Sequence, residues 1–238
     1  MKACVIGYGA MGKLISEMLG ENLACNVALE CDYKTLRDVK EDFDCIIDFS
    51  NPANLSMILD YENEFHKPIV FATTGYTDIQ LEQINNLSKT TPVLRSANFS
   101  LGVILLNRLV KEVTPILKDD FDIEVVEAHH NKKVDAPSGT AKMLLKSITD
   151  ETGYKVVAGR DGIAKREKEE VGIHSLRGGT IVGEHEVLYC GNDEILTLKH
   201  SAHSKRIFAT GAIKAAFYIV GQEAGYYDME DVLFGKNK

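Results

Sequence analysis

The chain opens with a short apolar stretch that runs directly into a glycine pattern. Ala3–Ile6 consists only of small or apolar residues, and residues 7–12 read G-Y-G-A-M-G, which fits G-x-G-x-x-G. The apolar residues that follow recur at the spacing of one helical face: Leu14, Ile15, Met18 and Leu19. A strand, a glycine turn and a helix in this order predict the first unit of a parallel sheet that binds a dinucleotide.

Each glycine of the pattern has its own structural reason. Gly7 permits a tight turn, Gly9 lets the backbone approach a pyrophosphate, and Gly12 lets the helix pack closely against the strand. The start of the helix adds free N–H groups and a positive dipole end. We therefore expect the whole loop to line a dinucleotide cofactor: Gly7, Tyr8, Gly9, Ala10, Met11 and Gly12.

An acidic residue after the second strand is the next requirement of such a site. Val27–Glu30 is predicted as that strand, and Glu30 follows Gly12 by 18 residues, close to the roughly 20 expected. A carboxylate there accepts the ribose hydroxyls and repels a 2′-phosphate, which favours NADH. Lys34 and Arg37 would soften that repulsion, so NADPH stays an alternative. A glycine turn that binds nothing is the structural alternative, and the combination of strand, turn, helix and acid argues against it.

The rest of the chain falls into two patterns. Strands alternate with helical patterns as far as residue 100, which predicts a parallel sheet covered on both faces. The further strands of this part are predicted at Cys45–Phe49, Ile69–Ala72 and Pro92–Leu94.

After residue 100 the order changes. Helices are predicted at Leu101–Leu117 and Ser138–Thr152, a loop at Gly159–Glu170, and strands at Phe121–Val126, Ile173–Arg177, Glu184–Cys190 and Glu194–His200. A last helix is predicted at Phe208–Val220. The expected architecture is α/β: a Rossmann-like dinucleotide-binding domain from residues 1–100 and 206–238, and a smaller α+β substrate and oligomerisation domain with a mixed sheet from residues 101–205.

Composition narrows the functional classes. The 238 residues carry a formal net charge of −8, with a pI of about 5.4, so no broad positive field for nucleic acid is expected. The five cysteines form no C-x-x-C pair and are expected to be buried free thiols, as in a reducing compartment. No signal peptide and no membrane-length apolar run is evident, which predicts a cytoplasmic protein without membrane contact. No metal is expected either, because the remaining histidines lack ligand spacing: His66, His174, His185, His200 and His203.

The densest polar segment covers residues 127–140. His129 and His130 are adjacent, Lys132 and Lys133 follow, and Ser138 is a candidate N-cap for the next helix. Histidine donates a proton near neutral pH, lysine supplies a compact cation, and a glycine at a helix start exposes N–H groups to an anion. This combination suits a carboxylate substrate that is protonated during reduction. A solvated loop is the alternative for a histidine pair alone.

The same segment resembles a known family. E-A-H-H at residues 127–130 and K-V-D-A-P-S-G-T-A at residues 133–141 look like the signature of 4-hydroxy-tetrahydrodipicolinate reductases, also called dihydrodipicolinate reductases. The family's other blocks are matched in order, at residues 72–75, 96–100, 175–179, 182–185 and 208–212. The resemblance covers nearly the whole chain.

The resemblance implies a reaction and residue roles. NADH or NADPH would reduce the dehydrated form of a small dicarboxylate, 4-hydroxy-tetrahydrodipicolinate, to tetrahydrodipicolinate in the diaminopimelate route to lysine. His129 would donate the proton with Lys133 as its cationic partner, and the substrate carboxylates would contact His130, Ser138, Gly139 and Thr140. Further cofactor contacts would come from Ala72, Thr73, Thr74, Gly75, Ala97, Asn98 and Phe99. The family implies a homotetramer joined through the substrate domains.

Two positions depart from the family. Ala10 stands where an arginine often precedes Met-Gly, and Lys205, with Arg206 beside it, stands where an arginine is common near the cofactor. Two rival functions stay open: another imine or amino-acid dehydrogenase with the same first domain, and a dinucleotide-responsive regulator. The regulator would need a basic or helix-turn-helix segment, and none is evident in the sequence.

Overall fold

The structure is a computed structural model that describes residues 1–27, 36–37, 39 and 42–235. The chain divides into two compact units. Unit 1 comprises Met1–Leu101 and Arg206–Lys238, and unit 2 comprises Gly102–Lys205.

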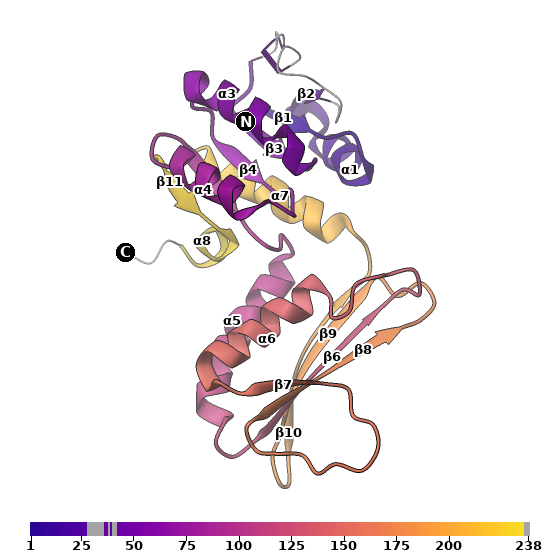
Figure 1. Cartoon of the computed structure of the whole chain (residues 1–238). Coiled ribbons are helices and arrows are strands. Elements are labelled where there is room, and N and C mark those ends of the chain that lie inside the picture. Colours follow the sequence, from indigo (N-terminus) through magenta and orange to yellow (C-terminus); the bar gives the residue numbers. More distant parts are fainter. Residues whose placement is uncertain (28–35, 38, 40–41, 236–238) are drawn as a thin grey trace. The chain divides into compact units, whose positions relative to one another are not determined.

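Unit 1 is built on a six-stranded sheet whose described strands all pair in parallel (Figure 1). The strand order is β11-β5-β4-β3-β1-β2. Their bounds are β1 (Ala3–Ile6), β2 (Leu23–Val27), β3 (Cys45–Asp48), β4 (Ile69–Phe71), β5 (Pro92–Arg95) and β11 (Gly225–Tyr227). Because β1 has β2 on one side and β3 on the other, the winding reverses between β1 and β3, which is where such sheets bind ligands.

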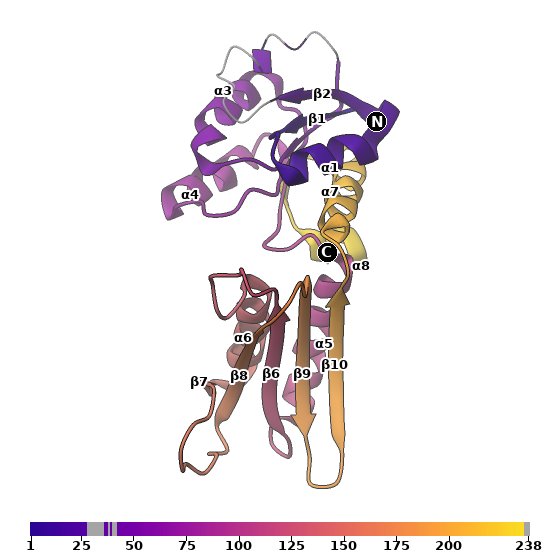
Figure 2. The ribbon, with the colours of Figure 1, turned by 90° about the vertical axis from the view of Figure 1, so that its right-hand side faces the viewer.

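Helices cover both faces of this sheet (Figure 2). On one face lie α3 (Leu55–Phe65) and α4 (Asp78–Leu87), whose apolar residues share a core with Ile6, Ile46 and Phe71. On the other face lie α1 (Ala10–Leu19) and α7 (Arg206–Ile219), which contact each other. The remaining short elements are η1 (Gly20–Asn22), η2 (Pro52–Asn54) and α8 (Met229–Phe234). The predicted Rossmann-like class is confirmed for this part of the chain.

The second strand begins earlier than predicted. The structure places β2 at Leu23–Val27 rather than Val27–Glu30, and residues 28–30 lie outside the described residues. The polar Asn26 does not interrupt the strand, because its side-chain amide donates to the Ser16 hydroxyl at 2.5 Å. That hydroxyl in turn donates to the Gly12 carbonyl at 2.8 Å, so the polar residue is tied to α1.

Backbone segments approach each other closely at three glycines of unit 1. Gly7 has φ +117°, and a Cβ there would lie 2.3 Å from the Phe49 carbonyl oxygen. A Cβ on Gly12 would lie 2.0 Å from the Gly7 oxygen, so the turn and the first turn of α1 pack backbone against backbone. On α7, a Cβ on Gly211 would lie 1.6 Å from the Phe99 oxygen. Side chains are therefore excluded at these contacts.

Unit 2 contains a five-stranded mixed sheet in the order β10-β9-β6-β8-β7. β6 pairs with β8 in parallel and with β9 antiparallel, so the predicted mixed sheet is confirmed. The strands are β6 (Asp122–His129), β7 (Lys155–Ala158), β8 (Glu170–Arg177), β9 (Gly183–Cys190) and β10 (Ile195–Ala202). The helices are α5 (Leu101–Leu117) and α6 (Gly139–Thr152). β7 was not predicted, and the polar loop predicted from Gly159 onwards ends where β8 begins.

One face of this sheet packs against α5 and α6 (Figure 2). Val110 of α5 and Leu144 of α6 are fully buried against Val125 and Val187 of the sheet. Tyr189 lies in the same core, and its hydroxyl is 2.8 Å from the Thr114 hydroxyl. The alternation of β6 therefore directs its odd-numbered residues toward the helices.

Two expectations from the sequence, on membrane-length helices and on free cysteines, can be compared with the described residues. Within them, no helix combines the length and apolar character that a membrane crossing requires. Four cysteines are free thiols, and two of these, Cys4 and Cys45, are buried. Cys31 lies outside the described residues.

The contact between α7 and the Phe99 backbone predicts a stability effect. Gly211→Ala should lower the free energy of unfolding by about 2 kcal/mol or more, because the added methyl meets a backbone oxygen that has little room to shift. Thermal unfolding followed by circular dichroism measures the effect. The control is Gly221→Ala, whose Cβ would lie 4.0 Å from its nearest neighbour, the Tyr218 oxygen. Equal melting temperatures for the two variants would contradict the prediction.

Candidate functional site

The first candidate site lies at the carboxyl ends of the parallel strands of unit 1. Gly7 follows β1 and approaches Phe49, which follows β3. The Phe49 and Phe99 rings are 6.3 Å apart, and the Ser50 N–H donates to the Thr73 hydroxyl at 2.7 Å. Segments that follow four different strands, β1, β3, β4 and β5, therefore meet at the edge where the winding reverses.

The glycine loop has the features that a pyrophosphate needs. A Cβ built on Gly9 meets no atom within 4 Å, so space is open at the position where the motif requires close approach. Gly9 is also the N-cap of α1, and no side chain caps that end of the helix. Tyr8 is 57% exposed beside the loop. The residues present thus fit a dinucleotide phosphate at the start of α1.

A cation that the sequence reasoning missed lies next to the same loop. The Lys13 ammonium is 4.6 Å from the centroid of the Tyr8 ring, a distance typical of a cation–π contact. Lys13 follows the pattern by a single residue, which is the signal that could have drawn attention to it. Lys13 thus supplies a positive charge near the loop, whereas Ala10, at the position where the family often has an arginine, supplies none.

A buried carboxylate, Asp48, ties two of the converging segments together. Its side chain is fully buried at the end of β3, and it accepts hydrogen bonds from the Ser50 hydroxyl and from the Tyr76 hydroxyl, the latter at 2.9 Å. Burial raises the pKa of Asp48, and the hydrogen bonds from Ser50, Thr73 and Tyr76 oppose that rise. Asp48 is therefore the link between the loops after β3 and β4.

The other predicted cofactor residues are placed as follows. Thr73 is buried. Thr74 and Gly75, which follow it, are exposed, and so is Ala97 on the segment after β5. The Asn98 side chain accepts from the Ser100 N–H at 2.8 Å. Glu30 lies outside the described residues, and Lys205 is an exposed residue at the end of unit 2.

The second candidate site lies where β6 ends in unit 2. Glu127 is in register with Ser175 of β8 and His185 of β9, and His129 is in register with Arg177. β6 was predicted to end at Val126, but it continues to His129 because these polar side chains are paired on the helix-covered face. Glu127 is fully buried and His129 is 9% exposed.

Glu127 is the centre of this cluster. The two terminal nitrogens of Arg177 donate to its two carboxylate oxygens at 2.9 and 2.8 Å, as in a bidentate pair. The Ser138 N–H donates to the same carboxylate at 3.2 Å, and His129 Nδ1 lies 2.5 Å from it. Burial favours the neutral acid, but the hydrogen bonds from Arg177, Ser175 and His129 outweigh it and lower the pKa of Glu127 to about 2. The carboxylate is therefore ionised at neutral pH.

The start of α6 is attached to the same cluster. Ser138 caps the helix, as predicted, by accepting from the Ala141 N–H at 3.2 Å, and its hydroxyl lies 2.8 Å from His185 Nε2. Burial, together with repulsion from His129, lowers the pKa of His185 to about 4. A neutral His185 can accept a hydrogen bond from the Ser138 hydroxyl, so this histidine has a partner within the cluster. Gly139 has no atom within 4 Å of an added Cβ, which leaves the N-terminus of α6 open to an anion.

The remaining residues of the segment lie outside the buried cluster and are exposed or half-buried. The Lys133 ammonium pairs with Asp135 at 2.7 Å, and the pKa of that carboxyl is lowered chiefly by this hydrogen bond. Lys132 is exposed and His130 is half-buried. Arg177 donates to the Asp135 carbonyl at 2.7 Å and so fastens the loop to the end of β8. The sequence block that contains Arg177 was recognised, but its role depends on pairing across strands.

Three potential metal ligands come together in this cluster. One ligand atom from each of Glu127, His129 and His185 lies within 4.8 Å of the others. Both carboxylate oxygens already accept from Arg177, whose guanidinium opposes a second cation at the same place. The geometry thus favours an internal ion pair over a metal centre.

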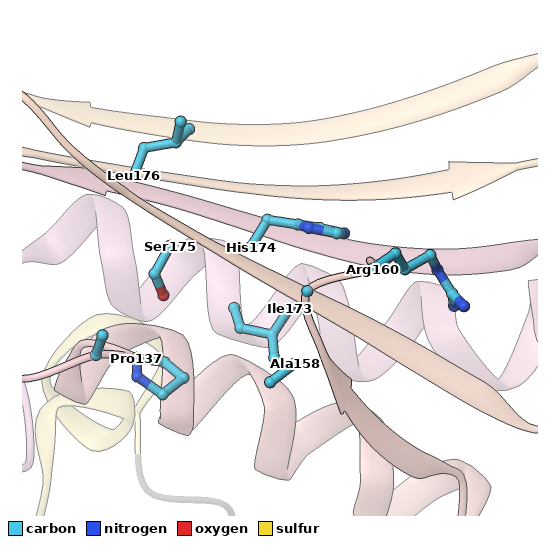
Figure 3. A pocket seen from close by; sticks show the side chains of 9 residues that line it. Pro137, Ala158, Arg160, Ile173, His174, Ser175 and Leu176 are labelled. Carbon is cyan, nitrogen blue, oxygen red and sulfur yellow. The ribbon is translucent and has the colours of Figure 1, made fainter. Parts of the chain in front are cut away.

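A cavity of about 430 Å³ borders the cluster in unit 2. Figure 3 shows Ser175 pointing toward Pro137, while His174 and Arg160 extend the other way along the strand. Arg160 pairs with Glu170 at 2.9 Å and His174 with Glu124 at 3.0 Å. The charges of the cavity are therefore internally compensated, and it offers no free cation to a ligand.

Comparisons with known proteins cover both units. The family model described as "Dihydrodipicolinate reductase, N-terminus" matches residues 1–99, and "Dihydrodipicolinate reductase, C-terminus" matches residues 102–233. A protein of Clostridium novyi named 4-hydroxy-tetrahydrodipicolinate reductase is 42% identical over 242 residues, which covers 96% of each chain. One of Brachyspira hyodysenteriae with the same name is 42% identical, over 98% of this chain and 100% of its own.

A solved structure shows a similar fold. It is a dipicolinate-bound dihydrodipicolinate reductase from Paenisporosarcina sp. TG-14, with a TM-score of 0.76 and 21% identity over 96% of this chain and 97% of its own. Fold and family together imply a nicotinamide dinucleotide cofactor. The chain belongs to the dihydrodipicolinate reductase family.

Proposed function

We propose that this protein reduces 4-hydroxy-tetrahydrodipicolinate, by way of dihydrodipicolinate, to tetrahydrodipicolinate with NADH or NADPH. The reaction belongs to the diaminopimelate route to lysine. The observation that carries the proposal is the cluster at the end of β6, where His129 lies against an ionised, buried Glu127 next to the open start of α6. This is a proton donor beside an anion-binding helix end, within a chain of this reductase family.

Unit 1 is proposed as the dinucleotide-binding domain and unit 2 as the substrate and oligomerisation domain. The open space at Gly9 and the uncapped start of α1 support the first assignment. When bound, the reduced nicotinamide supplies a hydride from its C4 atom. The converging segments after β1, β3, β4 and β5 would hold and orient it, with Thr73, Gly75, Asn98 and Phe99 among the contacts.

His129 is proposed as the proton donor of the reaction. Its ring is nearly buried, and its Nδ1 atom lies 2.5 Å from the Glu127 carboxylate. The N–H groups at the start of α6, around Gly139 and Thr140, would donate hydrogen bonds to one substrate carboxylate. The half-buried Lys133 would exchange its exposed partner, Asp135, for a second carboxylate, and His130 would contribute a further contact.

The family implies a homotetramer, which we retain as a proposal. The helices α5 and α6 pack against one face of the sheet of unit 2. On the opposite face, Leu176 is 55% exposed. Sedimentation velocity on the purified protein tests this part. A tetramer is the expected species, and a monomer at micromolar concentration would contradict it.

The activity itself is tested in a coupled assay. A dihydrodipicolinate synthase generates the unstable substrate in situ. The reduction is measured by the loss of nicotinamide absorbance, once with NADH and once with NADPH. We expect oxidation that depends on both the synthase and this protein. No oxidation with either nucleotide would contradict the function, and turnover of other cyclic imines or keto acids instead would favour the rival dehydrogenase.

His129→Gln tests the proton donor. Because glutamine cannot deliver a proton, kcat should fall by about 10²-fold or more, while the Kd for NADH, measured by fluorescence titration, should change less than about twofold. His203→Gln is the control, since His203 is exposed and has no assigned role. Equal losses of kcat and of NADH affinity in His129→Gln would show that the residue is structural.

The two adjacent lysines provide a matched pair. Lys133→Ala should lower kcat/KM by about 10- to 100-fold, the range for loss of one charge-assisted hydrogen bond to a carboxylate. Lys132→Ala, at the exposed neighbouring position, should keep kcat/KM near that of the unchanged protein. The coupled assay at varied substrate supply measures both. The proposed role of Lys133 is wrong if the two variants behave alike.

A further inference from the structure

The partners of Glu127 determine which nitrogen of His129 carries a fixed proton. The carboxylate faces Arg177 of β8, the Ser138 N–H at the start of α6 and His129 Nδ1 of its own strand, with His185 of β9 in register. An ionised carboxylate is only an acceptor. The group opposite it, Nδ1 of His129, must therefore be protonated.

Arg177 keeps the carboxylate in this state. Its guanidinium occupies both oxygens, and it is itself fastened to the carbonyls of Leu176 and Asp135, each at 2.7 Å. Because both terminal nitrogens of Arg177 are held by these hydrogen bonds, its guanidinium has little freedom to turn away from Glu127. The consequence for His129 is that the ring cannot exchange its Nδ1 proton without breaking this pair, so the proton available for transfer is on Nε2.

The surroundings of Nε2 agree with a role in transfer. A Cβ built on Gly183, the first residue of β9, would lie 3.1 Å from Nε2 and 3.5 Å from the neighbouring ring carbon, Cδ2. An alanine at this position would place a methyl group against the nitrogen. With glycine at this position, no methyl group lies against that edge of the ring.

We propose that Glu127, held by Arg177, is a positioning residue that fixes the Nδ1-protonated form of His129, and that Gly183 keeps Nε2 accessible as the single proton-delivering atom. This inference rests on the proposed function. In the step itself, the Nε2–H bond of the imidazolium breaks and its electron pair stays on Nε2. The proton goes to the anionic centre that hydride addition leaves in the conjugated ring of the substrate. His129 is left as the neutral Nδ1–H form and regains a proton from water.

Glu127→Gln tests the positioning. Glutamine is close in shape but neutral, and its amide can accept from Nδ1–H or donate to Nδ1, so both neutral forms of His129 become possible. The full chain, labelled with ¹⁵N-histidine, is studied by NMR, and the His129 signals are assigned by their loss in His129→Gln. We expect one neutral form, protonated on Nδ1, in the unchanged protein. In Glu127→Gln we expect a mixture or the Nε2–H form, with kcat at least about 100-fold lower and NADH affinity retained.

Gly183→Ala is an independent arm that leaves the Glu127 pair intact. The Nδ1–H form should persist in its NMR spectrum, while kcat falls at least about 10-fold because the methyl covers Nε2. Gly178→Ala is the matched control at the end of β8, since an added Cβ there meets no atom within 4 Å. It should retain kcat.

The outcomes separate the inference from the function it rests on. A neutral Nε2–H form in the unchanged protein, or an unaltered form in Glu127→Gln, overturns the role of Glu127. Full activity of Gly183→Ala overturns the role of Gly183. Full activity of His129→Gln removes the proposed proton donor instead, and the NMR result then still decides whether Glu127 fixes the ring.

Discussion

The ion pair between the buried Glu127 carboxylate and the partly buried Arg177 organises the functional end of unit 2. Four segments meet at this ion pair: the end of β6, the end of β8 and the start of α6 through Glu127, and the loop at Asp135 through Arg177. Removing one partner of such a pair typically costs about 3–5 kcal/mol, because a charge is left buried without compensation. Because His129 contacts the same carboxylate, the geometry of the proposed proton donor and the stability of this end of the sheet depend on one interaction.

Unit 1 relies on a different constraint, which is close approach of backbone. The turn at Gly7 passes so near Phe49 that no side chain fits, and α1 and α7 meet other backbone segments at Gly12 and Gly211. These contacts bring the carboxyl ends of β1, β3 and β5 together, and Asp48 adds the loop after β4. A dinucleotide site at this edge would thus be formed by backbone N–H groups and small residues, with Lys13 as a nearby positive charge.

Several features were accessible from local sequence. The glycine pattern predicted the start of a parallel sheet because each glycine has a steric reason at its own position, and a helix, α1, follows the pattern as expected, although it begins at Ala10 rather than at Gly12. The block from Glu127 to Ala141 predicted both the family and the N-cap at Ser138. Strand ends were predicted less well. β6 was predicted to end at Val126, just before the polar Glu127, and β2 was predicted to start at Val27, just after the polar Asn26, whereas it begins at Leu23.

Those errors have one physical origin. Whether a polar residue continues a buried strand depends on whether a partner compensates its burial, and the partners lie far away in the chain: Arg177 is 50 residues from Glu127, and Ser16 is 10 residues from Asn26. The sequence by itself determined the fold class, the family and the segment that we propose for the chemistry, because these depend on local spacing and on residue types. Only the tertiary structure decided that Glu127 is ionised, that Nδ1 of His129 faces it and that Gly183 borders Nε2. These properties depend on pairing between β6, β8 and β9, whose register brings distant residues into contact.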